Sequence, residues 1–222
     1  MDRPQPVTAE LVSDLCNLRQ LNRYFGSYAL TLHFLRRWIQ PGAQLRVLDL
    51  ATGSGDIPRL VIDYARKVGA TVTVEAIDQQ TSTLEIARGL SAAYPEIDFK
   101  QGDVLFFGDD GQYDIVLCSL ALHHFDEAAA VRLLERCRRL SRGFVLVSDL
   151  RRGLLATSGA YLLTAFIFRE SMTRTDARLS AERSFSFREF SSLVKRAGWR
   201  NFGHRKFRFA RQAVWLEPHS QR

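Results

Sequence analysis

The stretch VLDLATGSGDIP, residues 47–58, joins an apolar strand to the start of a helix through a loop that contains two glycines. Gly53 and Gly55 can take backbone conformations closed to other residues, and they let a ligand approach the main chain. We expect the helix to begin at about Ile57 or Pro58, with Pro58 suited to its first turn and Asp56 to its N-cap. Because free N–H groups at a helix start favour anions, the pattern predicts a ligand-binding loop.

The segments around this loop alternate between strand and helix patterns. Apolar runs predict strands at residues 45–50, 71–77, 98–102, 113–120 and 143–150. Amphipathic stretches predict helices at 8–23, 28–39, 57–68, 80–93, 126–141 and 187–199. Continuous apolar strands between helices indicate a parallel sheet covered on both faces. The runs 199–207 and 209–217 are too close for a crossover helix and predict an antiparallel hairpin. The expected fold is therefore α/β, a doubly wound, seven-stranded, mostly parallel Rossmann-like sheet with a C-terminal antiparallel hairpin, N-terminal helices and an inserted helical lid.

Composition limits the classes of protein that fit. The 222 residues, 46% of them hydrophobic, suffice for one domain with a sizeable core. The net charge of +7 is uneven, with −3 over residues 1–111 and +10 over 112–222, and 27 of the 31 basic residues are arginine. This excess fits either an arginine-rich genome or an anionic partner.

Cysteine use and hydropathy predict a location. Three scattered cysteines fit a reducing cytoplasm, and the first residues show no secretion signal. The longest uncharged run, Gly153–Phe168, is shorter than a membrane-spanning helix needs. We expect a cytoplasmic protein without a membrane span, either a monomer or a homodimer.

Two acidic residues follow the second and third predicted strands. Asp78 lies 23 positions beyond Gly55, where an acid can accept both hydroxyls of a ribose, or where it can cap the helix that begins near Thr81. Asp103 is either a second ligand contact or a solvated turn residue. A dinucleotide fingerprint needs a third glycine at the place of Pro58, which weakens a dehydrogenase interpretation.

Together these motifs resemble the class I S-adenosylmethionine (SAM) methyltransferases. DLATGSGD at 49–56 is similar to the glycine motif of the ubiquinone and menaquinone C-methyltransferase group, with IDQQ and QGDVL following as its ribose and adenine motifs. The resemblance covers residues 45–150 well and the hairpin in outline, and it implies SAM as cofactor. The residues implied as cofactor contacts are Asp49, Ala51, Gly53, Gly55, Asp78, Gln79, Asp103, Val104, Ser119 and Leu120, with His124 as a further candidate.

The resemblance also implies a role for each motif. Asp49 and Gly53 would line the methionine part of SAM, Asp78 would hold the ribose, and Asp103 the adenine amino group. Ala51 departs from the broad family, which often has glycine there, although the quinone group tolerates alanine.

The end of the fourth predicted strand carries a pair of histidines. In CSLALHHFD, residues 118–126, His123 and His124 lie just past the strand, and Asp149 ends the fifth strand, which we expect to be its neighbour. The spacing resembles small-molecule O-methyltransferases of natural-product pathways, which implies His123 as general base and Asp149 as the acid that orients it. A packed histidine without a role is the alternative. The sequence lacks the proline-rich motif of N-methyltransferases of nucleic-acid bases, and no spacing suggests a metal.

The predicted domain organisation is a single methyltransferase domain over residues 1–222. It divides into a helical cap at 1–42, a SAM-binding core at 45–150, a lid insertion at 151–186, and a helix and hairpin at 187–217. The lid is apolar, which fits either an ordinary buried helix or a substrate pocket. Tyr24 and Tyr28 are possible contacts from the cap. Arg151 and Arg152 either attract an acidic head group or keep a helix end solvated.

The expected function is methyl transfer from SAM to a small, aromatic or apolar acceptor, most plausibly on oxygen. Three alternatives stay open: an RNA or protein methyltransferase using the basic half, C-methylation of a quinone-type acceptor, and a SAM-binding protein without catalysis. The first of these is less favoured because an apolar lid does not suit nucleic acid.

Overall fold

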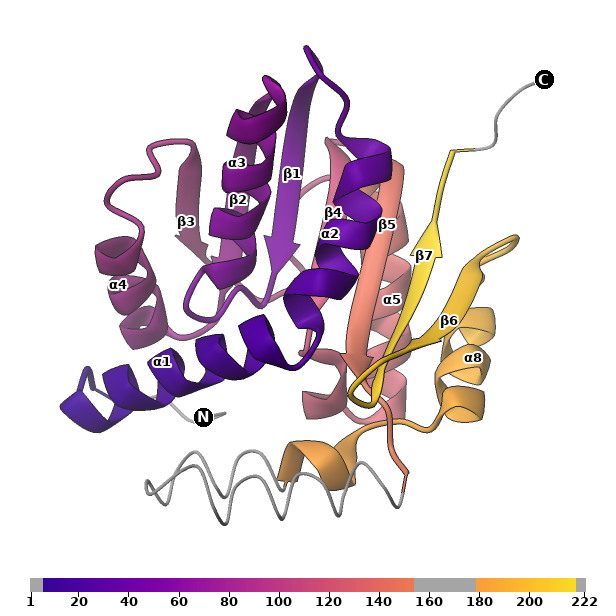
Figure 1. The fold of residues 1–222 in the computed structure, drawn as a ribbon. Helices are drawn as coiled ribbons and strands as arrows, with labels where there is room; N and C mark the ends of the chain where they lie inside the picture. Colours follow the sequence, from indigo (N-terminus) through magenta and orange to yellow (C-terminus); the bar gives the residue numbers. More distant parts are fainter. Residues whose placement is uncertain (1–5, 154–178, 219–222) are drawn as a thin grey trace.

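The computed structural model describes residues 6–153 and 179–218, and these form a seven-stranded sheet of order β3-β2-β1-β4-β5-β7-β6 (Figure 1). Strands β1 to β5 pair in parallel with one another. Strand β7 is antiparallel to both β5 and β6, so β6 runs in the same direction as β5. This order confirms the predicted doubly wound fold with its reversed hairpin. The strands are β1 Gln44–Leu50, β2 Thr71–Asp78, β3 Ile97–Gln101, β4 Tyr113–Ser119, β5 Ser141–Leu150, β6 Gly203–Phe207 and β7 Arg211–Leu216.

The helices lie close to the predicted ranges. They are α1 Ala9–Tyr24, α2 Ser27–Trp38, α3 Asp56–Val68, α4 Thr81–Leu90, α5 Glu127–Leu140 and α8 Phe187–Arg196, with a short 3₁₀ helix, η1, at Leu122–His124. The predicted helices 80–93 and 187–199 extend a few residues past the observed ends, since α4 ends before Ser91 and α8 before Ala197. Gly198 directly follows Ala197, the C-cap residue of α8, and has φ 72°.

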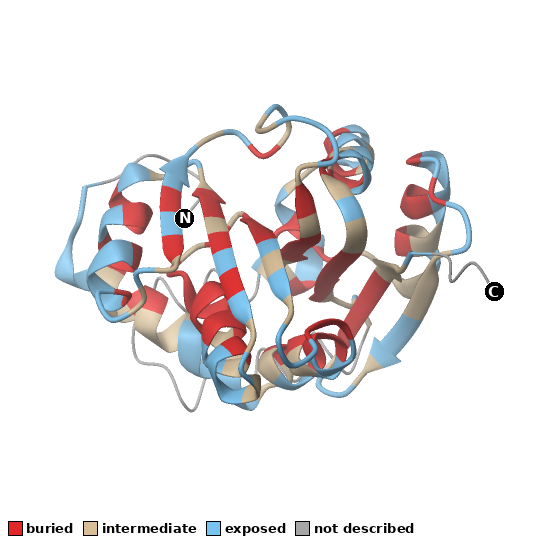
Figure 2. Cartoon of the chain, turned by 90° about the horizontal axis from the view of Figure 1, so that it is seen from above, coloured by how far each residue is buried: buried red, intermediate tan, exposed pale blue. Residues whose placement is uncertain are grey.

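Helices cover both faces of the sheet, as Figure 2 shows from above. On one face α2, α3 and α4 pack on alternate strand residues such as Val47 and Ile115, and on the other α5 and α8 pack on Leu48 and Val116. Successive strand side chains point to opposite faces, so every central strand serves two cores. This explains why the strands read as continuous apolar runs.

The parallel strands all end at the same edge of the sheet. Leu50 of β1 pairs with Ile77 of β2 and with Cys118 of β4, so the loops after these three strands start side by side. Helix α1 lies across this edge, below the arrowheads in Figure 1. In open α/β sheets ligands bind at this edge, and here a helix covers it.

Residues 186–216 return the chain to the sheet. A capping box at Ser186 and Glu189 begins α8, and the Trp199 indole N–H donates to the Leu134 carbonyl at 2.9 Å. Strand β7 then pairs with β5, with Arg211 opposite Leu150. The hairpin therefore brings residues near 210 to the strand end that carries Asp149.

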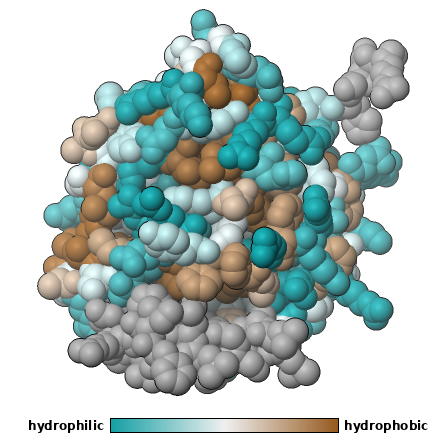
Figure 3. Space-filling model, in the orientation of Figure 1, coloured by the Kyte–Doolittle hydropathy of each residue, from teal (hydrophilic) through white to brown (hydrophobic). Residues whose placement is uncertain are grey.

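Many exposed arginines of the basic half pair with acids. Arg136 and Arg139 share Asp110, and Arg142 binds Asp114. On the face shown in Figure 3, hydrophilic side chains are interspersed with hydrophobic ones. This pairing favours solvated surface over a nucleic-acid footprint as the reason for the positive charge.

The described helices are all too short or too polar to cross a membrane. Most of the predicted lid, residues 154–178, lies outside the described part of the chain, as does most of the run Gly153–Phe168. The lid thus stays a prediction.

Candidate functional site

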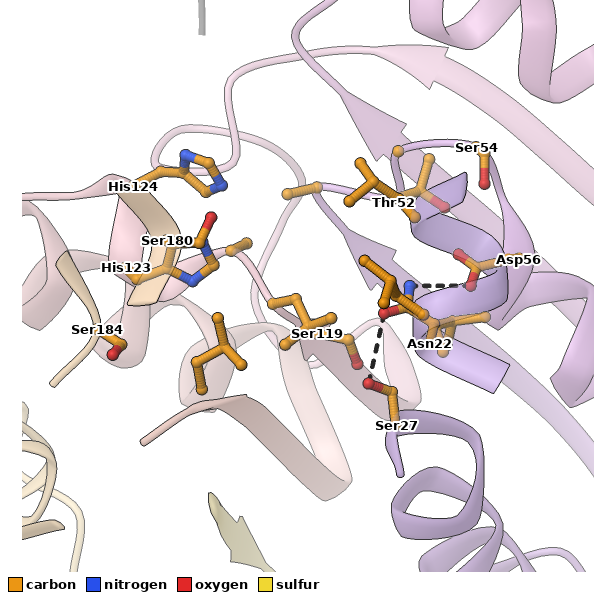
Figure 4. A pocket seen from close by; sticks show the side chains of 18 of the residues that line it. Asn22, Ser27, Thr52, Ser54, Asp56, Ser119, His123, His124, Ser180 and Ser184 are labelled. Carbon is orange, nitrogen blue, oxygen red and sulfur yellow. Dashed lines mark hydrogen bonds between the residues drawn. The ribbon is translucent and has the colours of Figure 1, made fainter. Parts of the chain in front are cut away.

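A cavity of about 1240 Å³ opens at the carboxyl edge of the sheet. Its wall combines α1, the loops after β1 to β5, and the turn of the hairpin. Figure 4 shows His123 and His124 on one side of it, and Asn22, Ser27 and Asp56 on the other. The two histidine side chains thus lie across the cavity from the acidic side chain of Asp56.

The glycine loop is held in an unusual backbone path. Ala51, Gly53 and Gly55 have φ values of 57°, 54° and 72°. A Cβ on Gly55 would come within 2.7 Å of the Phe99 ring, so this position requires glycine for space as well as for φ. Ala51 tolerates a left-handed conformation at some cost, which gives a physical reason why glycine often stands there in the resembling family.

Asp78 joins the end of β2 to the glycine loop. Its Oδ2 accepts from Gly53 N at 2.9 Å and its Oδ1 from Gln80 N at 3.0 Å. Burial raises the pKa of its carboxyl, while the backbone hydrogen bonds and the charge of His124 oppose that rise. The cap of α4 is Gln80, so the N-cap interpretation of Asp78 is wrong.

Asp49 and Asp56 are two more acids on the cavity wall, both buried. Burial raises the pKa of Asp49 to about 8, against a hydrogen bond from Thr52 and with the charges of Asp56 and Asp78 adding to the rise. Burial also raises the pKa of Asp56, against hydrogen bonds from Asn22 and Tyr28 and the charge of Arg59. A cation placed here would favour the ionised form of these acids.

The predicted cap role of Asp56 is wrong. Gly55 is the cap residue of α3, and Asp56 is the first residue of the helix. Its Oδ2 accepts from the Asn22 side chain at 3.1 Å, and Ser27 donates to Asn22 at 3.4 Å (Figure 4). Asp56 therefore connects α1 to the glycine loop.

The two tyrosines singled out in the cap differ in position. Tyr28 interacts with Asp56 and Arg19, and burial together with the charge of Asp56 raises its pKa to about 12. Tyr24 is 65% exposed, and neither tyrosine lies among the described wall residues of the cavity.

The predicted adenine and strand-four residues also reach the cavity. Asp103 Oδ1 accepts from Leu105 N at 2.9 Å, so this acid caps its own turn while it lines the wall, and Val104 is buried beside it. Ser119 accepts from the Ser148 hydroxyl at 3.2 Å, and Leu120 has φ 56°. Gln79 lines the wall from an exposed position.

His123 and Asp149 form a buried pair. The two side chains are 4% and 2% exposed, and His123 Nδ1 lies 2.6 Å from Asp149 Oδ1. Asp149 Oδ2 accepts from the backbone N–H of His123 at 2.9 Å, and Oδ1 also accepts from Leu150 N. Because the carboxylate accepts at Nδ1, the proton of the neutral ring lies there. His123 Nε2 is buried and has no hydrogen-bond partner in the described part of the chain, so its lone pair is free to take a proton.

Eleven of the predicted site residues line the cavity, and two lie behind the wall. Gly55 shapes the loop from beneath, and Asp149 lies behind His123. Sequence reasoning missed Asn22, which a polar residue inside an apolar helix face could have signalled, and Arg211, a charged residue beginning an apolar strand. Metal-ligand clusters of three or more His, Cys, Asp or Glu are absent from residues 6–153 and 179–218.

Comparison with known proteins gives the class. Residues 47–143 match the family described as "Methyltransferase domain". The chain is 36% identical over 81 residues to a 2-phytyl-1,4-naphtoquinone methyltransferase of Thermosynechococcus vestitus, covering 36% of this chain and 35% of that one. It is 31% identical over 128 residues to a ubiquinone biosynthesis O-methyltransferase of Paraburkholderia xenovorans, covering 53% and 50%. The chain thus spans half or less of the length of these curated relatives.

Solved structures share the fold. A SAM-dependent methyltransferase of Aquifex aeolicus aligns with TM-score 0.64 and 17% identity over 92% of this chain and 96% of that one. Human N-acetylserotonin methyltransferase in complex with SAM aligns with TM-score 0.66 and 18% identity over 93% and 55%. Magnesium protoporphyrin IX methyltransferase of Synechocystis with bound SAH (S-adenosylhomocysteine) aligns with TM-score 0.57 and 17% identity over 86% and 82%.

The chain therefore has the fold of the class I SAM-dependent methyltransferases, and its residues 47–143 match a methyltransferase domain. Within that class it has distant similarity to ubiquinone and menaquinone methyltransferases. The site fits a SAM-type cofactor on its own chemistry, because Asp49, Asp56 and Asp78 offer three acids to a ligand that carries a sulfonium and an ammonium group.

Proposed function

We propose that this protein methylates a hydroxyl oxygen of a small aromatic or apolar acceptor, with SAM as the methyl donor. The observation that carries the proposal is the buried His123–Asp149 pair, whose Nε2 is unpartnered at the wall of a cavity that also holds the glycine loop. Bound SAM would supply a methyl group activated by its sulfonium. The protein has to orient the acceptor and take its proton.

The pair suits proton removal from a hydroxyl. His123 Nε2 would accept the proton, while Asp149 holds the ring through Nδ1 and stabilises the imidazolium that forms. The second carboxylate oxygen, bound to the backbone N–H of His123, fixes the acid relative to η1. Asp149 is therefore a positioning residue, and His123 is the catalytic residue.

The cofactor contacts follow from the acids and the loop. We propose that Asp49 and Gly53 line the methionine part, that Asp78 and Gln79 hold the ribose, and that Asp103 with the backbone of Val104 holds the adenine. Ala51, Ser119, Leu120 and His124 line the same wall and complete the proposed contacts, with Gly55 shaping the loop.

The nature of the acceptor is supported by the rest of the wall. Leu18, Leu21 and Phe25 contribute apolar surface from α1 and the turn after it. Leu150 at the end of β5 adds to it, as does Phe209 in the β6–β7 turn, whose ring lies 5.7 Å from that of Phe25. A small set of polar groups in an apolar wall is typical of small-molecule sites. Of the two curated relatives, one is named as an O-methyltransferase of ubiquinone biosynthesis.

The test starts by finding the acceptor. Purified protein is incubated with methyl-labelled SAM and an extract of the source organism, and the labelled product is identified. Turnover of that acceptor is then measured for His123→Ala and Asp149→Asn, with His33→Ala on the exposed side of α2 as matched control. We expect kcat to fall about 100-fold or more for His123→Ala, and SAH affinity to stay within about twofold.

Asp149→Asn needs a separate readout. We expect it to lower kcat and to change the pH profile of kcat, because an amide no longer favours the imidazolium or the required tautomer. Normal turnover by His123→Ala at saturating SAM and acceptor would refute the proposed base.

A second candidate is C-methylation of a quinone-type acceptor. One observation favours it: the similarity to the 2-phytyl-1,4-naphtoquinone methyltransferase. The same base would remove a ring hydroxyl proton and make a ring carbon nucleophilic. The NMR spectrum of the labelled product separates the two, since an O-methyl and a C-methyl group differ in chemical shift.

A further inference from the structure

Two arginines line the acceptor side of the cavity at one place in the fold. Arg151 follows β5 directly, and Arg211 begins β7. The backbone N–H of Arg151 donates to the Ala210 carbonyl at 2.7 Å, and Arg211 pairs with Leu150 in the strand register. Both side chains thus start beside the strand end that carries Asp149.

Neither guanidinium has an acid partner in the described part of the chain. Arg211 is 6% exposed, and its Nε donates to the Phe25 carbonyl at 3.1 Å. Arg151 Nε is buried, and no acceptor among the described residues reaches it. By contrast, exposed arginines such as Arg142 hold their acids at 2.8 Å. A buried cation is unfavourable unless an anion compensates it.

The cavity wall carries charges of both signs. Its acids Asp49, Asp56 and Asp78 come from the glycine loop and the end of β2, and Arg19 of α1 also lines the wall, while Arg151 and Arg211 come from the end of β5 and the start of β7. Burial lowers the pKa of Arg211 to about 10, and the charge of Asp149 opposes that change. The two guanidiniums lie beside the single acid Asp149, so a second carboxylate would balance their formal charges.

We infer that the acceptor carries a carboxylate, bound by Arg151 and Arg211, with its hydroxyl at His123. The acceptor class is then an aromatic hydroxy acid. This inference rests on the proposed function and specifies its substrate. The planar guanidinium matches a carboxylate in a bidentate geometry, and hydrogen bonds between charged groups are about twice as strong as neutral ones.

A different role for Arg211 has to be separated from this one. Arg211 could act only through Asp149, as a charge that keeps the acid ionised. That role leaves the buried Nε of Arg151 unexplained, and it predicts no preference for charged acceptors. Binding measured without turnover therefore separates the two roles.

The first arm of the experiment needs no variant. Wild-type protein saturated with SAH is titrated by calorimetry with alkyl-substituted hydroxybenzoates, each compared with its own methyl ester. The ester keeps the ring, chain and hydroxyl and removes only the charge. We expect at least one acid to bind about tenfold or more tightly than its ester.

The second arm uses Arg151→Gln and Arg211→Met. Each is expected to reduce the preference for acid over ester about tenfold, with SAH affinity within about twofold of wild type. The matched controls are Arg152→Gln, next in the chain, and Arg205→Met, exposed on the same hairpin, and they should keep the preference. Since Arg211→Met could fail to fold, the wild-type comparison stands without it.

Two outcomes would overturn the inference: no acid in the series binds more tightly than its ester, or the preference survives both substitutions. Failure of the proposed function has a different signature. A protein that binds SAH and prefers acids but transfers no methyl group retains the carboxylate site and loses the proposed reaction.

Discussion

The buried carboxyl of Asp49 should make cofactor binding depend on pH. Burial raises its pKa to about 8, so the free protein holds this acid mostly protonated at neutral pH. A cationic ligand beside it favours the carboxylate and lowers that pKa, so binding releases a proton. The sign follows: affinity for SAM rises with pH until the pKa of the free protein is passed.

The size of the effect follows from the same value. Below pH 8 each pH unit should raise the contribution of Asp49 to the affinity by up to about tenfold, or about 50-fold between pH 6 and 8, because the acid is half ionised at pH 8. At pH 7, with a pKa of about 8, about 0.9 proton should be released from Asp49 for each ligand bound.

The assay is calorimetric titration with SAM in two buffers of different ionisation enthalpy, which counts the protons released. Other groups of the ligand and the site also exchange protons on binding, so the measured quantity is the difference between wild type and Asp49→Asn. The variant keeps the shape of the side chain and cannot ionise. Equal proton release by the two proteins, or a wild-type affinity that falls relative to the variant as pH rises, would refute the reasoning.

Three further changes test the site and its support. Asp78→Ala should weaken SAH binding about 10- to 100-fold by calorimetry, because the ribose loses a charged acceptor; unchanged affinity would contradict the ribose role. Gly55→Ala should lower the free energy of unfolding by about 2–4 kcal/mol, since φ is 72° and its Cβ meets the Phe99 ring, whereas Gly69→Ala, at φ 73° with open space, should cost about 1 kcal/mol. Ser186→Ala removes the capping box of α8 and should cost about 1 kcal/mol in denaturant unfolding, and no loss would mean that the cap is not needed.

Strand periodicity and the glycine loop were enough to predict the sheet. Each central strand feeds two cores, so its apolar run is continuous and its neighbours follow from short connections. The pairing of His123 with Asp149 was also predictable, because Asp149 lies at the end of β5 and His123 follows shortly after the end of β4, the adjacent parallel strand. Which side chains meet at the ends of adjacent strands can thus be predicted from the sequence.

Contacts between distant segments were harder to predict. The hydrogen bond from Asn22 to Asp56 joins α1 to the glycine loop, and the sequence suggested a local cap for Asp56 instead. Arg211 reaches the cavity only because β7 pairs with β5, and a strand pattern does not specify which neighbour it takes. Side-chain function at such places depends on tertiary pairing rather than on local spacing.

The place of β7 in the sheet also determines the order in which parts of the sheet can form during synthesis. Residues 151–210 separate β5 from the strand that completes its hydrogen bonding, so β5 leaves the ribosome as an open edge. The acids proposed to bind the cofactor are all made before that edge is closed, whereas Arg211 arrives with the closing strand. A chain halted before β7 would contain the proposed cofactor contacts but not Arg211. It would also expose the unpaired edge of β5, which is the kind of surface that chaperones cover.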